Sequence, residues 1–313
     1  MPSEPEKHPI IRLGTRQSPL AMAQAVETRE RLCAAHGWPE EAVELVPVVA
    51  SGDKILDRPL AEIGGKALWT RELDVWLGEG RIDVSVHSMK DVETLRPDEF
   101  TLGAILPRAD KRDVLVGAAS LADLPEGAVV GTSAPRRAAQ TLHARPDLKV
   151  VMFRGNVATR LGKLADGEAD ATFLAKAGLD RLGEGGIGTP LPQDDWLPAP
   201  AQGAIGLECR AEDTRVLGLL APIDHAPSRA EILAERAVLA GLGGTCHSPI
   251  ALMSTFDEGT LHLRCILFSP DGRERAEGST SAKAGDMAAM TRFAGELLGS
   301  AAPSIRAVFT GAE

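Results

Sequence analysis

Short apolar segments alternate with helix-like segments through the first 200 residues, and this alternation limits the possible folds more than any other feature. The alternation is interrupted around Pro107–Asp110 and then starts again, which gives two series. Alternating strands and helices are typical of α/β folds, in which helices cover a mostly parallel sheet. The expected strands are Ile11–Gly14, Glu44–Ala50, Ile82–His87, Asp113–Gly117, Val129–Gly131, Val150–Phe153 and Ala171–Leu174.

The pattern changes in the last third of the chain, after an apolar strand expected at Ala204–Glu208. The expected elements there are an alanine-rich helix opened by a capping box at Ser228 and Glu231, an antiparallel hairpin of Leu261–Phe268 and Arg273–Ser281, and a final helix from about Asp286 to Leu298. This is an α+β pattern, so we place a domain boundary near Pro227.

Polar residues suited to anions follow the expected strands of the first series. Arg16 and Ser18 lie where a strand leads into a helix, and Ser18 is a good N-cap. Free backbone N–H groups at a helix start favour anionic ligands. Lys90 and Asp91 follow the third strand, at the edge where open α/β sheets bind ligands. Taken alone, this dipeptide is more typical of an exposed ion pair at a turn.

The second series places hydroxyls and arginines at its strand ends. These residues are Thr132, Ser133, Arg136, Arg137, Arg154 and Arg160. Arginines usually form a solvated basic face, but this protein has a net charge of −10. Because a guanidinium can bind a carboxylate through two parallel hydrogen bonds, the arrangement indicates a site for a polyanion.

Cys246 is the one cysteine whose neighbours suggest a working thiol. It lies in the glycine-rich loop Gly241–Pro249, whereas Cys33, Cys209 and Cys265 have surroundings typical of core packing. His247 is adjacent, but neighbouring residues seldom orient a thiol and an imidazole toward each other. Glycines beside the thiol leave room for a bulky group. The residues alone leave both a nucleophile and an attachment point open.

Composition and missing motifs exclude several other classes of protein. The net charge of −10 argues against a general nucleic-acid or membrane-surface binder. No apolar run approaches the about 20 residues of a membrane span, and the N-terminus lacks the apolar core of a signal peptide. We therefore expect a cytoplasmic protein with reduced cysteines. No CxxC or HExxH sequence is present, so no metal site is expected.

Together these segments resemble the porphobilinogen deaminase family over essentially the whole chain, in order and spacing. The matching segments are Thr15–Leu20, Gly64–Lys66, Val86–Val92, Gly131–Ser133 with Arg136 and Arg137, Arg154–Val157 with Thr159 and Arg160, Ala201–Ala204 with Glu208–Arg210, and Cys246 with Pro249 and Ile250. The resemblance implies two doubly wound α/β lobes of the type II periplasmic-binding-protein kind and a C-terminal α+β domain with a small antiparallel sheet. The implied division is 1–107 with about 201–226, then 108–200, then 227–313.

The resemblance also implies a transferase of tetrapyrrole biosynthesis, which leads to porphyrins and haem. Four porphobilinogen molecules would be joined head to tail, with loss of four ammonia, and hydrolysis would release hydroxymethylbilane. The chain would grow on a dipyrromethane cofactor held by a thioether bond to Cys246. Porphobilinogen and the growing chain would be the only partners, without nucleic acid or membrane, and the protein would be a monomer.

Residue roles follow from the same resemblance. Asp91 would be the catalytic residue, because a carboxylate can stabilise the cation formed as ammonia leaves. The cofactor would be bound by Lys90, Thr132, Ser133, Arg136, Arg137 and Arg160. The substrate or growing chain would be bound by Arg16, Ser18, Arg154, Arg160 and Arg181. Lys66 would belong to a mobile loop.

Some positions depart from the commonest family pattern and put single contacts in question. They are Glu62, Ala134 with Pro135, Thr245 and Ala251. Two other functions remain as alternatives: an organic-anion binding module without chemistry, and a thiol acyltransferase or hydrolase that uses Cys246.

Overall fold

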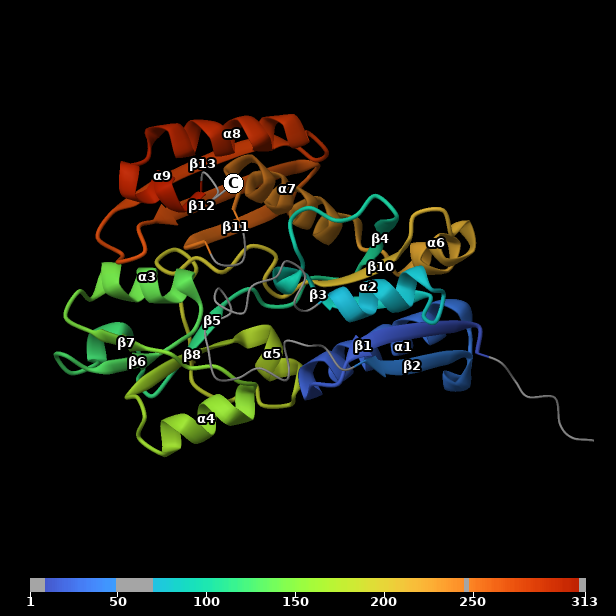
Figure 1. Ribbon diagram of the computed structural model, residues 1–313, viewed down its shortest axis with the longest axis horizontal. Coiled ribbons are helices and arrows are strands. Elements are labelled where there is room, and N and C mark those ends of the chain that lie inside the picture. Colours follow the sequence, from blue (N-terminus) through green and yellow to red (C-terminus); the bar gives the residue numbers. More distant parts are fainter. Residues whose placement is uncertain (1–8, 49–69, 245–247, 310–313) are drawn as a thin grey trace, which may run out of the picture.

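The computed structural model describes residues 9–48, 70–244 and 248–309, in which three separate β-sheets organise the fold (Figure 1). Two sheets have five strands each, and the third has three. In Figure 1 the first lobe (blue and cyan) lies beside the second (green), and the C-terminal domain (orange and red) lies above them.

The first sheet has the strand order β2-β1-β3-β10-β4. Its strands are β1 (Ile11–Arg16), β2 (Val43–Val48), β3 (Val84–Ser88), β4 (Phe100–Ile105) and β10 (Ile205–Arg210). β1 pairs in parallel with β2 and β3, whereas β10 is antiparallel to β3 and β4. Its helical segments are α1 (Pro19–His36), η1 (Glu40–Ala42), α2 (Arg71–Gly78), η4 (Met89–Asp91), α6 (Thr214–Leu220) and η6 (Ala221–Ile223). Pro47 lies in β2 at the sheet edge, as its lack of an N–H predicts.

The second sheet repeats this arrangement in the order β7-β6-β8-β5-β9. Its strands are β5 (Asp113–Val116), β6 (Val129–Gly131), β7 (Lys149–Val151), β8 (Ala171–Ala175) and β9 (Thr189–Pro190). β6 is parallel to β7 and β8, and β5 is antiparallel to β8 and β9. Its helical segments are η5 (Leu121–Asp123), α3 (Pro135–Ala144), α4 (Val157–Ala165) and α5 (Lys176–Arg181). The antiparallel strands β5 and β10 each follow the point where the chain crosses to the other lobe.

The C-terminal sheet is an antiparallel meander of β11 (Ile250–Asp257), β12 (Thr260–Phe268) and β13 (Arg275–Lys283). One face packs against the helices α7 (Ala226–Leu242), α8 (Met287–Ser300) and α9 (Pro303–Phe309). Leu261, Leu263, Cys265 and Leu267 alternate along β12 and point into this core. At one end the other face packs on the second lobe, through Phe268 and Ala139 of α3. The predicted fold class is therefore confirmed.

The expected capping box at Ser228 and Glu231 is wrong, because α7 begins two residues earlier, at Ala226. His225 is the N-cap, and its Nδ1 accepts a hydrogen bond from the Ser228 N–H at 3.3 Å. Glu231 instead forms ion pairs with Arg108 at 2.9 Å and Lys111 at 2.8 Å. The other expected strands and helices agree with the observed ones to within a few residues. Among the helices of the described ranges, none is sufficiently long and apolar to cross a membrane.

Candidate active site between the lobes

Lys90 and Asp91 are placed by a tight turn that follows β3, the strand labelled near the middle of Figure 1. β3 pairs with β1 on one side and with β10 on the other, and the Met89 N–H donates to the Ala204 carbonyl at 3.1 Å. Met89 is buried, so it anchors the single turn of 3-10 helix that carries Lys90 and Asp91. Both polar side chains are half-buried and leave the sheet at its ligand-binding edge.

Lys90 lies within electrostatic reach of residues from the second lobe. Burial lowers the pKa of the Lys90 ammonium, Asp91 and Asp113 oppose this effect, and Arg137 and Arg160 add to it. The structure therefore brings Lys90 and Asp91 of the first lobe together with two arginines that the sequence placed at other strand ends.

Arg160 confirms that these charges converge. The pKa of the Arg160 guanidinium is lowered to about 10, mainly by burial and also by the positive charges of Arg137 and Arg154, while the negative charge of Asp91 opposes this shift. We call Lys90, Asp91, Arg137, Arg154 and Arg160 the interlobe cluster. It holds four basic side chains and one acidic one, so bound carboxylates would relieve the repulsion among its cations.

Arg136 and Arg137, at the start of α3, are both buried and share one carboxylate. Asp113 accepts from Arg136 Nη2 at 2.8 Å and from Arg137 Nη2 at 2.7 Å. It also accepts from Trp196 Nε1 at 2.8 Å and Gln202 Nε2 at 2.9 Å. Burial alone would raise the pKa of the Asp113 carboxyl, but the two arginines outweigh it and hold the pKa well below its usual range. Asp113 was expected only as a strand residue, so its role was missed.

The two arginines keep unused donors. Arg136 Nη1 donates to the Leu197 carbonyl and Arg137 Nη1 to the Phe173 carbonyl, each at 2.9 Å. The Nε atoms of both are buried without a hydrogen-bond partner in the described part of the chain. A buried charged donor without a partner is costly, so these atoms suit an added acceptor such as a carboxylate.

The hydroxyls before α3 do not cap it. Ala134 is the N-cap of α3, and no side chain caps the helix. Thr132 is buried, and its Oγ1 accepts from the Ala134 N–H at 3.2 Å. Ser133 is half-buried beside it. Pro135 at the first helical position sets the helix start, which explains why a capping hydroxyl is dispensable.

Arg16 and Ser18 occupy the predicted junction between β1 and α1. Ser18 is the N-cap of α1, and its Oγ accepts from the Ala21 N–H at 3.3 Å.

Arg181, at the end of α5, binds groups of the first lobe. Its Nε donates to Glu27 of α1 at 3.0 Å, and its Nη2 donates to the Gly203 carbonyl at 3.2 Å. Arg181 thus connects the two lobes, which the sequence did not predict.

The predicted positions Cys246 and Lys66 lie outside the described residues, as do Glu62 and Thr245. α7 ends with Gly243 in the left-handed conformation, at φ 63°, two residues before Thr245. The Gly244 carbonyl accepts from Thr94 Oγ1 at 3.3 Å. The described chain therefore brings the end of α7 against the segment that follows Asp91.

The other three cysteines fit the structural role predicted for them. Cys209 and Cys265 are buried, and Cys33 is half-buried. Burial raises the pKa of the Cys209 thiol to about 11, and it also raises the pKa of the Cys33 and Cys265 thiols. Since the thiolate is the reactive form, none of the three suits nucleophilic chemistry.

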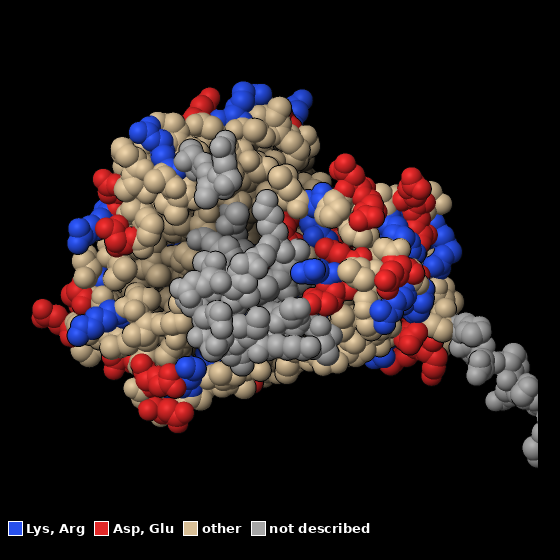
Figure 2. Space-filling view, in the orientation of Figure 1, with Lys and Arg blue, Asp and Glu red and all other residues tan. Residues whose placement is uncertain are grey.

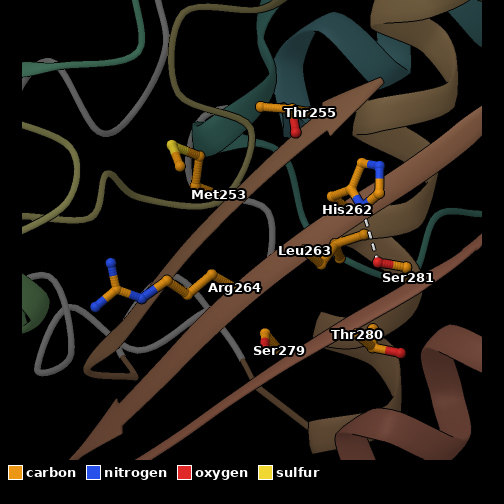
Figure 3. Close-up of a pocket in the computed structure, with 8 residues that line it drawn as sticks. All are labelled: Met253, Thr255, His262, Leu263, Arg264, Ser279, Thr280 and Ser281. Carbon is orange, nitrogen blue, oxygen red and sulfur yellow. Dashed lines mark hydrogen bonds between the residues drawn. The ribbon is translucent and has the colours of Figure 1, made fainter. Parts of the chain in front are cut away.

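A hollow on the open face of the C-terminal sheet lies apart from the predicted site residues (Figure 3). Arg264, His262 and Ser281 are among the residues that line it, and His262 and Ser281 are joined by a hydrogen bond of 2.8 Å. No predicted site residue lines it.

Figure 2 shows acidic and basic side chains intermixed around the rim of the molecule, unlike the one-sided charge of the interlobe cluster. Within the described ranges, no group of three His, Cys, Asp or Glu residues could hold a metal ion.

Solved structures of low sequence identity resemble parts of this chain. The periplasmic VFT2 domain of Bordetella pertussis BvgS is 17% identical, with 74% of this chain and 93% of that chain covered and a TM-score of 0.41. A periplasmic substrate-binding protein of an ABC transporter from Coxiella burnetii is 14% identical, with 72% and 96% covered and a TM-score of 0.40.

Family models and curated relatives cover nearly all of the chain. The model described as "Porphobilinogen deaminase, dipyromethane cofactor binding domain" matches residues 11–218, and that of the porphobilinogen deaminase C-terminal domain matches residues 229–296. The porphobilinogen deaminase of Sphingopyxis alaskensis is 55% identical over 305 residues, 96% of each chain. That of Paracoccus denitrificans is 50% identical over 305 residues, 96% of this chain and 97% of the relative. With both halves matched and relatives this similar along its length, the chain belongs to the porphobilinogen deaminase family.

Proposed function

We propose that Asp91 is the catalytic group of this chain, that Cys246 is its attachment point, and that the interlobe cluster binds the carboxylates. The family polymerises porphobilinogen in tetrapyrrole biosynthesis, so the chain is a transferase with a dipyrromethane cofactor. One observation carries the assignment of roles: Asp91 lies within electrostatic reach of half-buried Arg160, and Lys90 within reach of Arg137, across the two lobes.

The residues of the interlobe cluster and the neighbouring Arg136 fit a ligand with several carboxylates. Each porphobilinogen unit carries an acetate and a propionate, so every addition brings more negative charge. Lys90, Arg137 and Arg160 repel one another in partly buried positions, and the Nε atoms of Arg136 and Arg137 lack partners in the described part of the chain. Carboxylates would supply both the missing acceptors and the missing negative charge. When bound, the dipyrromethane supplies the pyrrole carbon to which the first substrate unit is joined.

Asp91 would stabilise the substrate as its carbon–nitrogen bond breaks. Loss of ammonia leaves a positive charge shared between the side-chain carbon and the pyrrole nitrogen of the substrate. A fixed carboxylate in a partly buried site stabilises that charge far more than water does, because it needs no reorganisation.

The remaining roles are divided by position. Lys90, Thr132, Ser133, Arg136 and Arg137 would hold the cofactor. Arg16, Ser18 and Arg154 would bind the incoming substrate. Arg160, which lies within electrostatic reach of both Asp91 and Arg137, would contact the cofactor as well as the substrate. Arg181 is paired with Glu27, so it would engage the chain only after that pair opens. Lys66 would act from its loop.

The test is a pair of variants read by intact-protein mass and by tetrapyrrole formation. Asp91→Asn should keep the mass of two linked pyrrole units and lower kcat by at least about 100-fold, since it removes the charge without changing the shape. Asp98→Asn, at an exposed aspartate of the same stretch, is the matched control and should retain full activity. Near-normal kcat in Asp91→Asn would remove Asp91 from the catalytic role.

The attachment point has its own measurement. Cys246→Ala should lack the added mass of the two pyrrole units and should form no tetrapyrrole, whereas Cys33→Ala should keep both. A fully active wild-type protein without the added mass would contradict the assignment and favour a free thiol.

We also propose a cytoplasmic monomer, because the net charge of −10 opposes self-association and the three described cysteines are free thiols. Light scattering after size exclusion measures the oligomeric state.

A further inference from the structure

The stretch Val92–Arg96, which follows Asp91 directly, is fixed to the first lobe by its own arginine. We call it the 92–96 segment. Arg96 Nη2 donates to Glu208 of β10 at 2.7 Å, and Arg96 Nη1 donates to Glu93 at 3.1 Å. Because Glu208 is buried in the sheet, this ion pair ties the end of the segment to a rigid strand.

The same segment is held from the other side by α7 of the C-terminal domain. Arg236 Nη2 donates to the carbonyls of Glu93 at 2.7 Å and Thr94 at 3.0 Å, and Arg236 Nη1 reaches the Val92 carbonyl at 3.5 Å. The planar guanidinium thus holds three successive carbonyls, which a flexible ammonium could not do with the same geometry. One turn earlier on α7, Ile232 packs in the apolar cluster that contains Met89 and Val92.

Thr94 connects the segment to the glycine-rich loop. Its Oγ1 donates to the Gly244 carbonyl at 3.3 Å, just after α7 ends at Leu242. Gly244 precedes Cys246 by two residues, and Val92 follows Asp91 by one. A short chain of hydrogen bonds therefore joins the residue next to Asp91 to a residue next to Thr245, and Arg236 lies at its centre.

We propose that Arg236 is a positioning residue which, with Thr94, sets the placement of Asp91 relative to the end of α7. This proposal rests on the roles proposed above for Asp91 and Cys246. The physical reason is geometric: the carboxylate acts on a reacting group that extends from a different domain, and a misplacement of about 1 Å can cost about 100-fold in rate. Without Arg236, the three carbonyls lose their common donor, and the residues next to Asp91 keep only the packing of Ile232 and the Thr94 hydrogen bond to hold them against α7 and the residues after it.

The chain offers a matched control on the same helix. Arg229 also donates from α7 to carbonyls of the first lobe, those of Leu102 at 3.2 Å and Gly103 at 2.9 Å. These carbonyls belong to β4, away from Asp91 in the chain. Arg229→Gln therefore removes a comparable tie between α7 and the lobe without touching the 92–96 segment.

The experiment compares Arg236→Gln, Arg236→Lys, Thr94→Val and Arg229→Gln with the wild type and with Asp91→Asn. Cofactor loading is measured by intact mass, amide hydrogen exchange by peptide, and kcat and KM with porphobilinogen. We expect Arg236→Gln to keep the cofactor mass, to raise exchange in peptides covering 92–96, and to lower kcat about tenfold with KM changed less than about twofold. Arg236→Lys should recover part of the loss, and Thr94→Val should show the same pattern more weakly.

Arg229→Gln should raise exchange in β4 and leave kcat within about twofold. Equal losses of kcat in Arg236→Gln and Arg229→Gln would show a merely structural tie and overturn the proposal, as would an unchanged kcat in a loaded Arg236→Gln protein. If Arg236→Gln fails to fold, an unchanged kcat in Thr94→Val overturns it instead. Normal kcat in Asp91→Asn would refute the catalytic assignment, independently of what exchange in 92–96 shows.

Discussion

Asp113 lets two arginines remain buried and charged side by side at the start of α3. Its four donors come from Arg136, Arg137, Trp196 and Gln202, so both carboxylate oxygens are fully used. Two neighbouring guanidinium groups without this charge would repel each other in a medium that screens poorly. The carboxylate therefore determines how much positive charge is left for a ligand.

Replacing Asp113 by Asn should destabilise the fold by about 3–5 kcal/mol, because it leaves two buried cations without their counter-ion. The free energy of unfolding from urea titration measures this. Asp110→Asn, which breaks the partly exposed pair with Arg112, is the control and should cost less than about 1 kcal/mol. Equal effects of the two substitutions would mean that burial adds nothing to the Asp113 contacts.

The pKa of Glu208 leads to a separate prediction about the stability of the fold at low pH. Burial alone would raise the pKa of its carboxyl, but His87 and Arg96 outweigh burial and lower the pKa to about 2. A carboxyl whose pKa is depressed in the folded state stabilises the fold above its unfolded pKa of about 4.3, and this contribution is lost as the pH falls through about 2. Glu208→Gln should therefore be about 2–3 kcal/mol less stable at pH 7, and the difference should shrink below pH 4. Exposed Glu212→Gln should show no such convergence.

The sequence predicted the cations of the site better than their partners. Arg137 and Arg160 could be placed because residues at the carboxyl ends of parallel strands meet at one edge of a sheet. Asp113, the partner of Arg137, lies at the start of an antiparallel strand, which the apolar pattern of Asp113–Val116 does not distinguish from a parallel one. Likewise, nothing in the pattern around Arg181 indicates Glu27, because that pair depends on how the two lobes pack.

At the scale of elements, the crossings between the lobes require close backbone approach. Gly203 precedes β10 and has φ 86°. It lies beside the segment that leads from the first lobe to the second, because the Ala109 N–H donates to the Gly203 carbonyl at 3.2 Å. A Cβ at Gly203 would lie 2.7 Å from the Ala109 carbonyl oxygen. Both the conformation and the contact exclude a side chain there.

Gly203→Ala should therefore lower the free energy of unfolding by about 2–3 kcal/mol, of which about 1–2 kcal/mol is the cost of a left-handed alanine. The control is Gly218→Ala, in the interior of α6 with nothing within 4 Å of the added Cβ. That change should stabilise the protein by about 0.5–1 kcal/mol. A shift of the same sign in both variants, measured by urea titration, would contradict the argument.

Element types were more predictable than element starts. Ser18 and Pro19 fix the start of α1 as expected, since capping and the proline ring both act within a few residues. For α7 the same reasoning chose Ser228, but His225 caps the helix and frees Glu231 to bind Arg108 and Lys111. β11 was not predicted, because Ile250 and Ala251 are buried on opposite faces and the strand there lacks alternation.

At the scale of the whole molecule, the two lobes are joined by an ion pair as well as by the two crossings. Glu27 of α1 pairs with Arg181 of α5 at 3.0 Å, and Glu27 also pairs with Arg31 at 3.2 Å. A growing polyanion that reaches Arg181 must therefore displace Glu27, whereas the first units added near the interlobe cluster need not.

Glu27→Gln should leave cofactor loading and the first addition unchanged and should speed the later additions about two- to fivefold. That factor corresponds to about 0.5–1 kcal/mol, the ordinary worth of a partly exposed ion pair. The measurement is the distribution of enzyme species with one to four added units, followed by intact mass after mixing with porphobilinogen. Arg31→Gln removes the other partner of Glu27 without touching Arg181, so it is the matched control and should leave the distribution as in the wild type. If Glu27→Gln also leaves it unchanged, Arg181 does not exchange Glu27 for the carboxylates of the chain, and the pair only holds the lobes together.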